Sequence, residues 1–140
     1  MAISTAEATW TGTLKDGAGT VKGTSGSLDA RFTYKTRFEG AAGGTTPEEL
    51  IGAAHAGCFS MFLAAQLTTA GFPPTRIRTT AAVHLGAGPA ITRIELTTEA
   101  EVPGVPRELF DEKVAASKAG CPVSKALAGV PDVAVEATLR

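Results

Sequence analysis

The chain has few of the residues that usually carry disulfide or metal chemistry. It contains two cysteines and two histidines in 140 residues. A small secreted fold that depends on disulfides would need several bridges. A structural zinc site needs four ligands, commonly with a CxxC pair, and the sequence has no such pair. The composition therefore argues against a disulfide scaffold, and we expect no metal and no cofactor.

An excess of one charge is also lacking. The formal net charge is −1, and the lysines and arginines are scattered. Nucleic acids and anionic membranes are recognised by clustered basic residues. The segment Met1–Glu7 has neither the basic start nor the apolar stretch of a secretion signal. We therefore expect a soluble, cytoplasmic protein with no nucleic-acid partner and no membrane association.

Only one long hydrophobic run is present, from Leu50 to Leu67. It approaches the length of a membrane span, but it carries His55, Ser60 and Gln66. These polar residues favour a core helix over a transmembrane one. Because the run is apolar on almost every side and rich in alanine and glycine, we expect this helix to be central and buried.

The start of this helix has a clear local signature. Thr46 suits the N-cap, Pro47 suits the first helical position, and Glu49 would complete a capping box. Gly71 and the two prolines after Phe72 predict an end near Thr69.

The rest of the sequence predicts strands and one further helix. Strand patterns occur around 8–14, 19–22, 76–85, 90–97 and 133–139, and a helix is expected from Pro106 to about Ala119. With 44% hydrophobic and 19% charged residues, the composition is typical of a globular protein. We expect a single domain over residues 1–140, of the α+β class, with an antiparallel sheet wrapped around the buried helix.

The two cysteines differ in their settings. Cys58 lies inside the apolar run, whereas Cys121 is followed directly by Pro122. Together they could form one reversible disulfide, which is the minimum for thiol redox chemistry. The simpler interpretation is two unrelated buried cysteines, since free cysteine is often buried. The number of cysteines does not decide between these interpretations.

Several charged residues could act on Cys58. His55 precedes it by three positions, so both share a helical face; a satisfied core histidine is favoured over a Cys–His pair. Glu48 lies about 15 Å away along a continuous helix, so it either complements the helix dipole or reaches Cys58 of another subunit. Arg37 is either a solvated charge or the cation that stabilises a thiolate.

The identity of the attacking thiol stays open at this level. Pro122 in a first helical turn would place Cys121 at a helix N-terminus, where unpaired amides and the helix dipole lower a thiol pKa. Helix position alone therefore favours Cys121 over Cys58.

Three ordered motifs resemble those of the OsmC/Ohr family, in its OsmC branch of osmotically inducible peroxidases. They are Thr36-Arg37-Phe38-Glu39-Gly40, the run Thr46–Met61, and Ala119-Gly120-Cys121-Pro122-Val123-Ser124. Shorter matches at Trp10–Gly12, Ala70–Pro73 and Ile91–Ile94 extend the likeness over nearly the whole chain.

The resemblance implies a thiol-dependent peroxidase that reduces organic hydroperoxides, and hydrogen peroxide more weakly. It implies that Cys58 attacks and becomes a sulfenic acid and that Cys121 resolves it as a disulfide. It also implies that Arg37 and Glu48 surround the reactive thiol, with Arg37 oriented by Glu48 and holding Cys58 as a thiolate. It further implies an OsmC-like intertwined homodimer and a lipoyl-type dithiol as reductant.

Some alternatives remain beside the resemblance. Four apolar side chains near these motifs could line an alkyl pocket or simply form core: Phe38, Phe59, Met61 and Phe62. A Cys58–His55 hydrolase or transferase would not need Cys121. A non-catalytic stress-response redox protein would not turn over peroxide.

Overall fold

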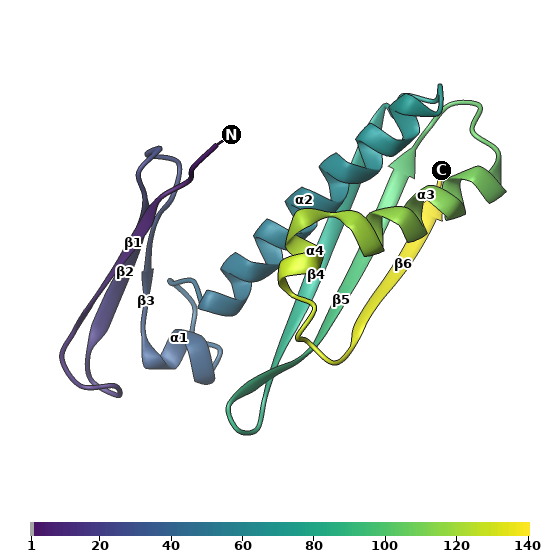
Figure 1. Cartoon of the computed structure of the whole chain (residues 1–140). Coiled ribbons are helices and arrows are strands. Elements are labelled where there is room, and N and C mark those ends of the chain that lie inside the picture. Colours follow the sequence, from purple (N-terminus) through teal and green to yellow (C-terminus); the bar gives the residue numbers. More distant parts are fainter. Residues whose placement is uncertain (1) are drawn as a thin grey trace. The chain divides into compact units, whose positions relative to one another are not determined.

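A computed structural model describes residues 2–140 and confirms the α+β class (Figure 1). The elements in chain order are β1 (Ala6–Thr11), β2 (Ala18–Gly23), β3 (Asp29–Phe32), α1 (Tyr34–Phe38), α2 (Pro47–Thr69), β4 (Arg76–Gly86), β5 (Ala90–Glu101), α3 (Arg107–Gly120), α4 (Pro122–Ala126) and β6 (Val133–Leu139). The chain divides into two compact units, one up to Leu50 and one over Ile51–Arg140. Helix α2 begins in the first unit and continues in the second. That both belong to one domain stays a prediction.

The first unit is built on a three-stranded antiparallel sheet in the order β1-β2-β3. Gly19 of β2 lies opposite Trp10 of β1 and Phe32 of β3. A Cβ atom at Gly19 would lie 2.5 Å from Phe32 Cε1 and 2.7 Å from Trp10 Cε3. The two aromatic rings therefore pack over a position that only glycine leaves free. The sequence predicted β1 and β2 but not β3 or α1.

Helix α2 begins as the sequence predicted. The Thr46 hydroxyl accepts a hydrogen bond from the Glu49 backbone N–H at 2.8 Å, and Pro47 is the first helical residue. The Glu49 carboxylate instead accepts from the Thr45 hydroxyl at 2.6 Å. The N-cap is therefore confirmed, while the capping box forms on one side only, because Glu49 has a nearer donor.

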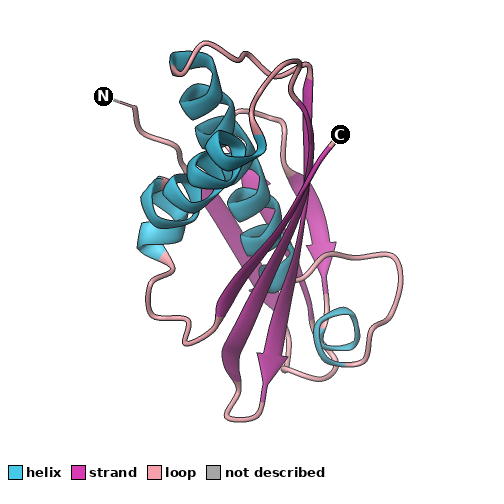
Figure 2. Ribbon diagram, turned by 90° about the vertical axis from the view of Figure 1, so that its right-hand side faces the viewer, coloured by secondary structure: helices cyan, strands magenta, loops and turns pink. Residues whose placement is uncertain are grey.

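The second unit contains a mixed sheet in the order β4-β5-β6 (Figure 2). Strands β4 and β5 form the expected antiparallel hairpin. Strand β6, however, pairs parallel with β5, so the prediction of a wholly antiparallel sheet is wrong there. The reason is the helical connection through α3 and α4, which carries the chain back so that β6 runs in the direction of β5.

Helices α2 and α3 pack on one face of this sheet (Figure 2). The buried core includes Phe59, Leu63 and Leu67 of α2, Ile94, Leu96 and Ala100 of β5, and Phe110 of α3. A chain of hydroxyls also ties α2 to the sheet. Ser60 donates to Thr79 at 2.7 Å, and Thr79 lies 2.9 Å from the buried Thr98 hydroxyl. These contacts fix one face of α2 against the strands.

The opposite face of α2 is open in the single chain. Met61 is 77% exposed, and Ala53 and Gly57 are exposed too. By length and hydropathy the helix would pass as a membrane span, and 28% of its most apolar window is buried. The expectation of a helix buried on all sides is therefore wrong for one copy of the chain, because the sheet and α3 cover only one face.

The packing at Gly19 gives a test of the first unit. Gly19→Ala should lower the free energy of unfolding by about 1–3 kcal/mol, because the added methyl group must displace the Trp10 or Phe32 ring. Trp10 is the only tryptophan, so its fluorescence follows this unit during denaturant unfolding. Gly129→Ala is the matched control, since nothing lies within 4 Å of a Cβ there. Equal stability of the two variants would contradict the packing argument.

Candidate active site

The structure brings the two cysteines together in the second unit. Cys58 lies on α2, and Cys121 occupies the junction where α3 ends and α4 begins. Both are free thiols, and each changes the pKa of the other. The interpretation of two unrelated cysteines is therefore wrong. A disulfide between them would need no large rearrangement of the fold.

Close packing between α2 and the end of α3 places the thiols side by side. Phe62 lies one helical turn after Cys58, and Gly120 directly precedes Cys121. A Cβ atom at Gly120 would lie 3.0 Å from Phe62 Cζ. The absence of a side chain at Gly120 therefore lets the Phe62 ring lie against the backbone next to Cys121.

Cys121 is held by Ser124. The Ser124 backbone N–H donates to the Cys121 sulfur at 3.3 Å, and the Cys121 thiol donates to the Ser124 hydroxyl at 3.1 Å. Burial raises the pKa of Cys121, but these contacts, with the neighbouring Cys58 thiol and the Val123 backbone, outweigh burial and lower it overall. Cys121 is thus the thiol that ionises first within one chain.

Cys58 differs from Cys121 in both ionisation and access. Burial raises the pKa of Cys58, and the neighbouring Cys121 raises it further, although the Val123 backbone N–H acts in the opposite sense. Cys58 is nevertheless partly exposed, whereas Cys121 has 0% exposure. Ionisation therefore favours Cys121, as helix position predicted, while access to a solvent-borne reactant favours Cys58.

His55 is buried at 0% exposure and does not pair with Cys58. Its Nε2 atom lies 2.8 Å from the Ser124 hydroxyl, while Nδ1 is buried with no hydrogen-bond partner in the described part of the chain. Burial lowers the pKa of His55, so the ring is neutral at pH 7. The predicted core histidine is confirmed as buried but is only half satisfied.

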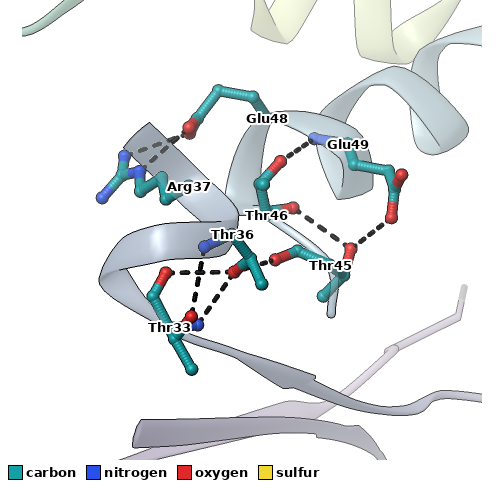
Figure 3. Close-up of polar contacts among 7 residues, drawn as sticks. All are labelled: Thr33, Thr36, Arg37, Thr45, Thr46, Glu48 and Glu49. Atoms are coloured by element: carbon teal, nitrogen blue, oxygen red, sulfur yellow. Dashed lines mark hydrogen bonds and ion pairs between the residues drawn. The ribbon is translucent and has the colours of Figure 1, made fainter. Parts of the chain in front are cut away.

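Arg37 and Glu48 form a two-point ion pair in the first unit (Figure 3). Arg37 Nε donates to Glu48 Oε1 at 2.9 Å, and Nη2 donates to Oε2 at 3.0 Å. Glu48 is 6% exposed, so this carboxylate is largely withdrawn from water. Bidentate contact fixes the plane of the guanidinium group. Glu48 thus orients Arg37 within its own chain, which is the pairing that the family resemblance implied.

A set of threonines positions α1, which carries Arg37 (Figure 3). Thr33 and Thr36 cap the helix reciprocally: Thr33 Oγ1 accepts from the Thr36 N–H at 3.1 Å, and Thr36 Oγ1 accepts from the Thr33 N–H at 2.9 Å. The Thr36 hydroxyl also bonds the Thr45 carbonyl at 3.0 Å. These bonds connect α1 to the segment just before α2, and so set the distance between Arg37 and Glu48.

The four apolar residues that the sequence offered for an alkyl pocket lie in different environments. Phe59 is core, Phe62 packs on Gly120, and Met61 is exposed. Phe38 is half exposed and borders a cavity of about 240 Å³ in the first unit. The other residues that line this cavity are Trp10, Leu14, Phe32, Thr33, Tyr34 and Arg37. An apolar cavity therefore adjoins the Arg37 side chain.

Sequence reasoning missed two functional features. Helix α1 is too short for a periodic pattern, although Thr33 and Thr36 have the spacing of a capping pair. In the sequence, Ser124 stands out only as part of a motif. Because it lies three residues after Cys121, its backbone N–H is placed where the side chain of an N-cap residue accepts a hydrogen bond. No group of three His, Cys, Asp or Glu side chains that could hold a metal occurs within residues 2–140.

Comparisons with known proteins show the family of the chain. The family model for OsmC-like protein matches residues 40–136. Peroxiredoxin OsmC of Escherichia coli is 53% identical over 125 residues, covering 86% of this chain and 87% of the relative. The organic hydroperoxide resistance protein OhrB of Bacillus subtilis has a TM-score of 0.65 at 25% identity, covering 97% of this chain and 98% of its own. An OsmC-like protein of Mycoplasma pneumoniae reaches a TM-score of 0.77 at 15% identity, covering 99% and 97% respectively, and supports the fold alone.

The fold and the thiol pair are those of a thiol-dependent peroxidase. The chain belongs to the OsmC/Ohr family, in its OsmC branch, as the sequence motifs predicted.

The contacts of Cys121 predict its titration. In Cys58→Ser, Cys121 is the only thiol and keeps both bonds to Ser124, so its ultraviolet thiolate absorbance should appear at a lower pH than that of an ordinary cysteine. The same variant unfolded in denaturant is the control, since its thiol has no partner there. A folded-state pKa at or above the unfolded value would show that burial outweighs the Ser124 bonds.

Proposed function

We propose that this peroxidase reduces organic hydroperoxides, with Cys58 as the attacking thiol and Cys121 as the resolving thiol. The observation that carries the proposal is the adjacency of two free thiols of which only Cys58 has access to solvent. A peroxide oxygen must contact the sulfur that it oxidises, so access outweighs the lower pKa of Cys121. The relatives support the substrate class, since OhrB is named for organic hydroperoxide resistance.

The proposed reaction balances with two thiols and one peroxide. The Cys58 thiolate attacks the terminal peroxide oxygen, the O–O bond breaks, and the alkoxide leaves and takes a proton to become the alcohol. Cys58 is left as a sulfenic acid. The Cys121 sulfur then attacks the Cys58 sulfur, and the S–O bond breaks to release water. An external dithiol, proposed to be of the lipoyl type, restores both thiols by exchange.

Arg37 is proposed to supply the positive charge that Cys58 lacks within its own unit. Burial raises the pKa of Cys58, so attack at neutral pH requires a nearby cation or hydrogen-bond donor. Arg37 is held in a fixed plane by Glu48 and keeps further N–H groups to donate to a thiolate or peroxide. The cavity beside Arg37 would receive the alkyl group.

We propose that the pair acts across an intertwined homodimer. Glu48 lies about 15 Å from Cys58 along the continuous helix α2. The open face of α2, with Ala53, Gly57 and Met61, is apolar and suits a second copy. Burial of this face would also favour a soluble, cytoplasmic protein over a membrane one. The Cys–His hydrolase alternative gains no support, because His55 bonds Ser124 and not Cys58.

Single-cysteine variants test the roles of the thiols. Cys58→Ser should abolish peroxide reduction. Cys121→Ser should still consume one equivalent of peroxide and stop at a sulfenic acid that dimedone traps, which mass spectrometry detects. Trapping of Cys121 in Cys58→Ser would reverse the assignment.

The same assay compares cumene hydroperoxide with hydrogen peroxide. We expect cumene hydroperoxide to react at least about tenfold faster, since each buried methylene contributes about 0.8 kcal/mol.

Variants of Arg37 test the charge and the dimer together. In a Cys121→Ser background, Arg37→Met should raise the pKa of Cys58 and slow its oxidation at neutral pH, with partial recovery at higher pH. Arg37→Lys should recover little, because lysine cannot make the two-point contact.

A mixture of Arg37→Met and Cys58→Ser proteins, exchanged through mild denaturant, then distinguishes the two arrangements. If each site uses Arg37 of one subunit and Cys58 of the other, mixed dimers contain an intact site and activity rises above both parents. No recovery in confirmed mixed dimers would place Arg37 and Cys58 of one chain in one site.

A further inference from the structure

His55 and Ser124 form a hydrogen-bonded chain that ends at Cys121. The Cys121 thiol donates to Ser124 Oγ at 3.1 Å, and Ser124 Oγ lies 2.8 Å from His55 Nε2. A serine hydroxyl has one proton and two lone pairs. When it accepts from the thiol, its own proton is free to point at Nε2. The atoms therefore lie in the order S–H, O–H, N that a proton relay requires.

The energetics of His55 also indicate a role beyond packing. With Nε2 accepting, the proton of the neutral ring lies on Nδ1, which is buried without a partner among residues 2–140. A buried donor without a partner destabilises the fold. An apolar side chain on this face of α2 would avoid that cost. The hydrogen bonds from His55 through Ser124 to Cys121 therefore suggest a role for a histidine at this position other than stability.

We propose that His55 is a positioning residue for the second half of the catalytic cycle, and that through Ser124 it takes the proton from Cys121 as the disulfide forms. The proposal rests on the proposed function, in which Cys121 resolves the Cys58 sulfenic acid. His55 bonds Ser124 and makes no hydrogen bond to Cys58, so the first step does not depend on it.

The protons balance in this step. As the Cys121 sulfur bonds to the Cys58 sulfur, its proton moves to Ser124 Oγ, and the Ser124 proton moves to His55 Nε2. The S–O bond of the sulfenic acid breaks, and the hydroxide that leaves takes a proton from solvent to become water. Burial lowers the pKa of His55, so the imidazolium then returns its proton to solvent.

The same relay runs in reverse when the disulfide is opened: His55 Nε2 takes a proton from solvent and passes it to Ser124, and Ser124 gives its own proton to the departing Cys121 sulfur. An external thiolate attacks the accessible sulfur, which is Cys58, and Cys121 is the leaving group. A leaving thiol of lower pKa departs faster. Removal of the relay should therefore slow both formation and reduction of the disulfide, while it leaves oxidation of Cys58 unchanged.

Two pairs of variants separate proton transfer from mere support. His55→Gln keeps a hydrogen-bonding group near the Nε2 position but cannot take a proton, whereas His55→Leu removes both. Ser124→Ala removes the link, and Ser124→Thr restores its hydroxyl. The matched controls are Ser117→Ala, which deletes another buried serine hydroxyl bonded only to the Lys113 carbonyl, and His84→Gln, which deletes the exposed histidine.

The first measurement needs no peroxide. Each protein is oxidised to the disulfide with diamide, and the rate of its reduction by dithiothreitol is followed by alkylation and mass spectrometry. The second measurement mixes reduced protein with one equivalent of cumene hydroperoxide and separates sulfenic acid from disulfide in quenched samples.

In both measurements, we expect His55→Gln, His55→Leu and Ser124→Ala to be slowed on the order of 100-fold. Ser124→Thr and the two controls should remain near the starting rate. A wild-type rate in His55→Gln would show that His55 only supports Ser124, and a wild-type rate in Ser124→Ala would show that Cys121 needs no relay; either result overturns the proposal. If no peroxide oxidises Cys58, the proposed function fails, while the diamide experiment still decides on the relay.

Discussion

The packing of Phe62 against Gly120 is the contact on which the thiol pair depends. The backbone before Cys121 can approach α2 this closely only because Gly120 has no side chain, since a Cβ there would lie 3.0 Å from the ring. Phe62 and Cys58 are one turn apart on the same helix, so a ring that fixes Gly120 also fixes Cys121 beside Cys58. The core of Phe59, Leu63 and Leu67 then holds α2 in place against the sheet.

A reactive thiol is usually both easily ionised and accessible, and in this arrangement the two properties belong to different cysteines. Cys121 has the more stable thiolate but is fully buried, while Cys58 is accessible but has a raised pKa. A peroxide must reach a sulfur before it can be reduced, so in the proposed reaction the accessible Cys58 attacks first and Cys121 reacts second. The lowered pKa of Cys121 also suits it to the proposed second step, because a thiol that loses its proton more easily attacks the oxidised Cys58 more readily.

Local signals carried most of what the sequence could predict. The Thr46 cap, the limits of α2 and the β4–β5 hairpin depend on neighbouring residues, and all were predicted. The parallel pairing of β6 was not, because alternation along a strand is the same for either direction of pairing. The open face of α2 was also missed, since hydrophobicity on all sides does not reveal whether the cover comes from the same chain or another. For the candidate site, motif resemblance supplied the proposed roles of Cys58, Cys121, Arg37 and Glu48. The bond between His55 and Ser124 was not predicted, because it joins residues too far apart for any local pattern.

The second unit contains two buried hydrogen-bond networks that differ in whether every polar group has a partner. A hydrogen-bonded network in a core is costly when one member lacks a partner. The Ser60, Thr79 and Thr98 hydroxyls satisfy one another and serve to tie α2 to the sheet. The His55, Ser124 and Cys121 network differs, because it leaves Nδ1 unpaired and connects a titratable ring to a thiol. A network kept only for stability would resemble the first. In the proposed relay, the second network places the Nε2 atom of His55 where it can take a proton from Cys121 through Ser124, and the unpaired Nδ1 is the cost of that placement.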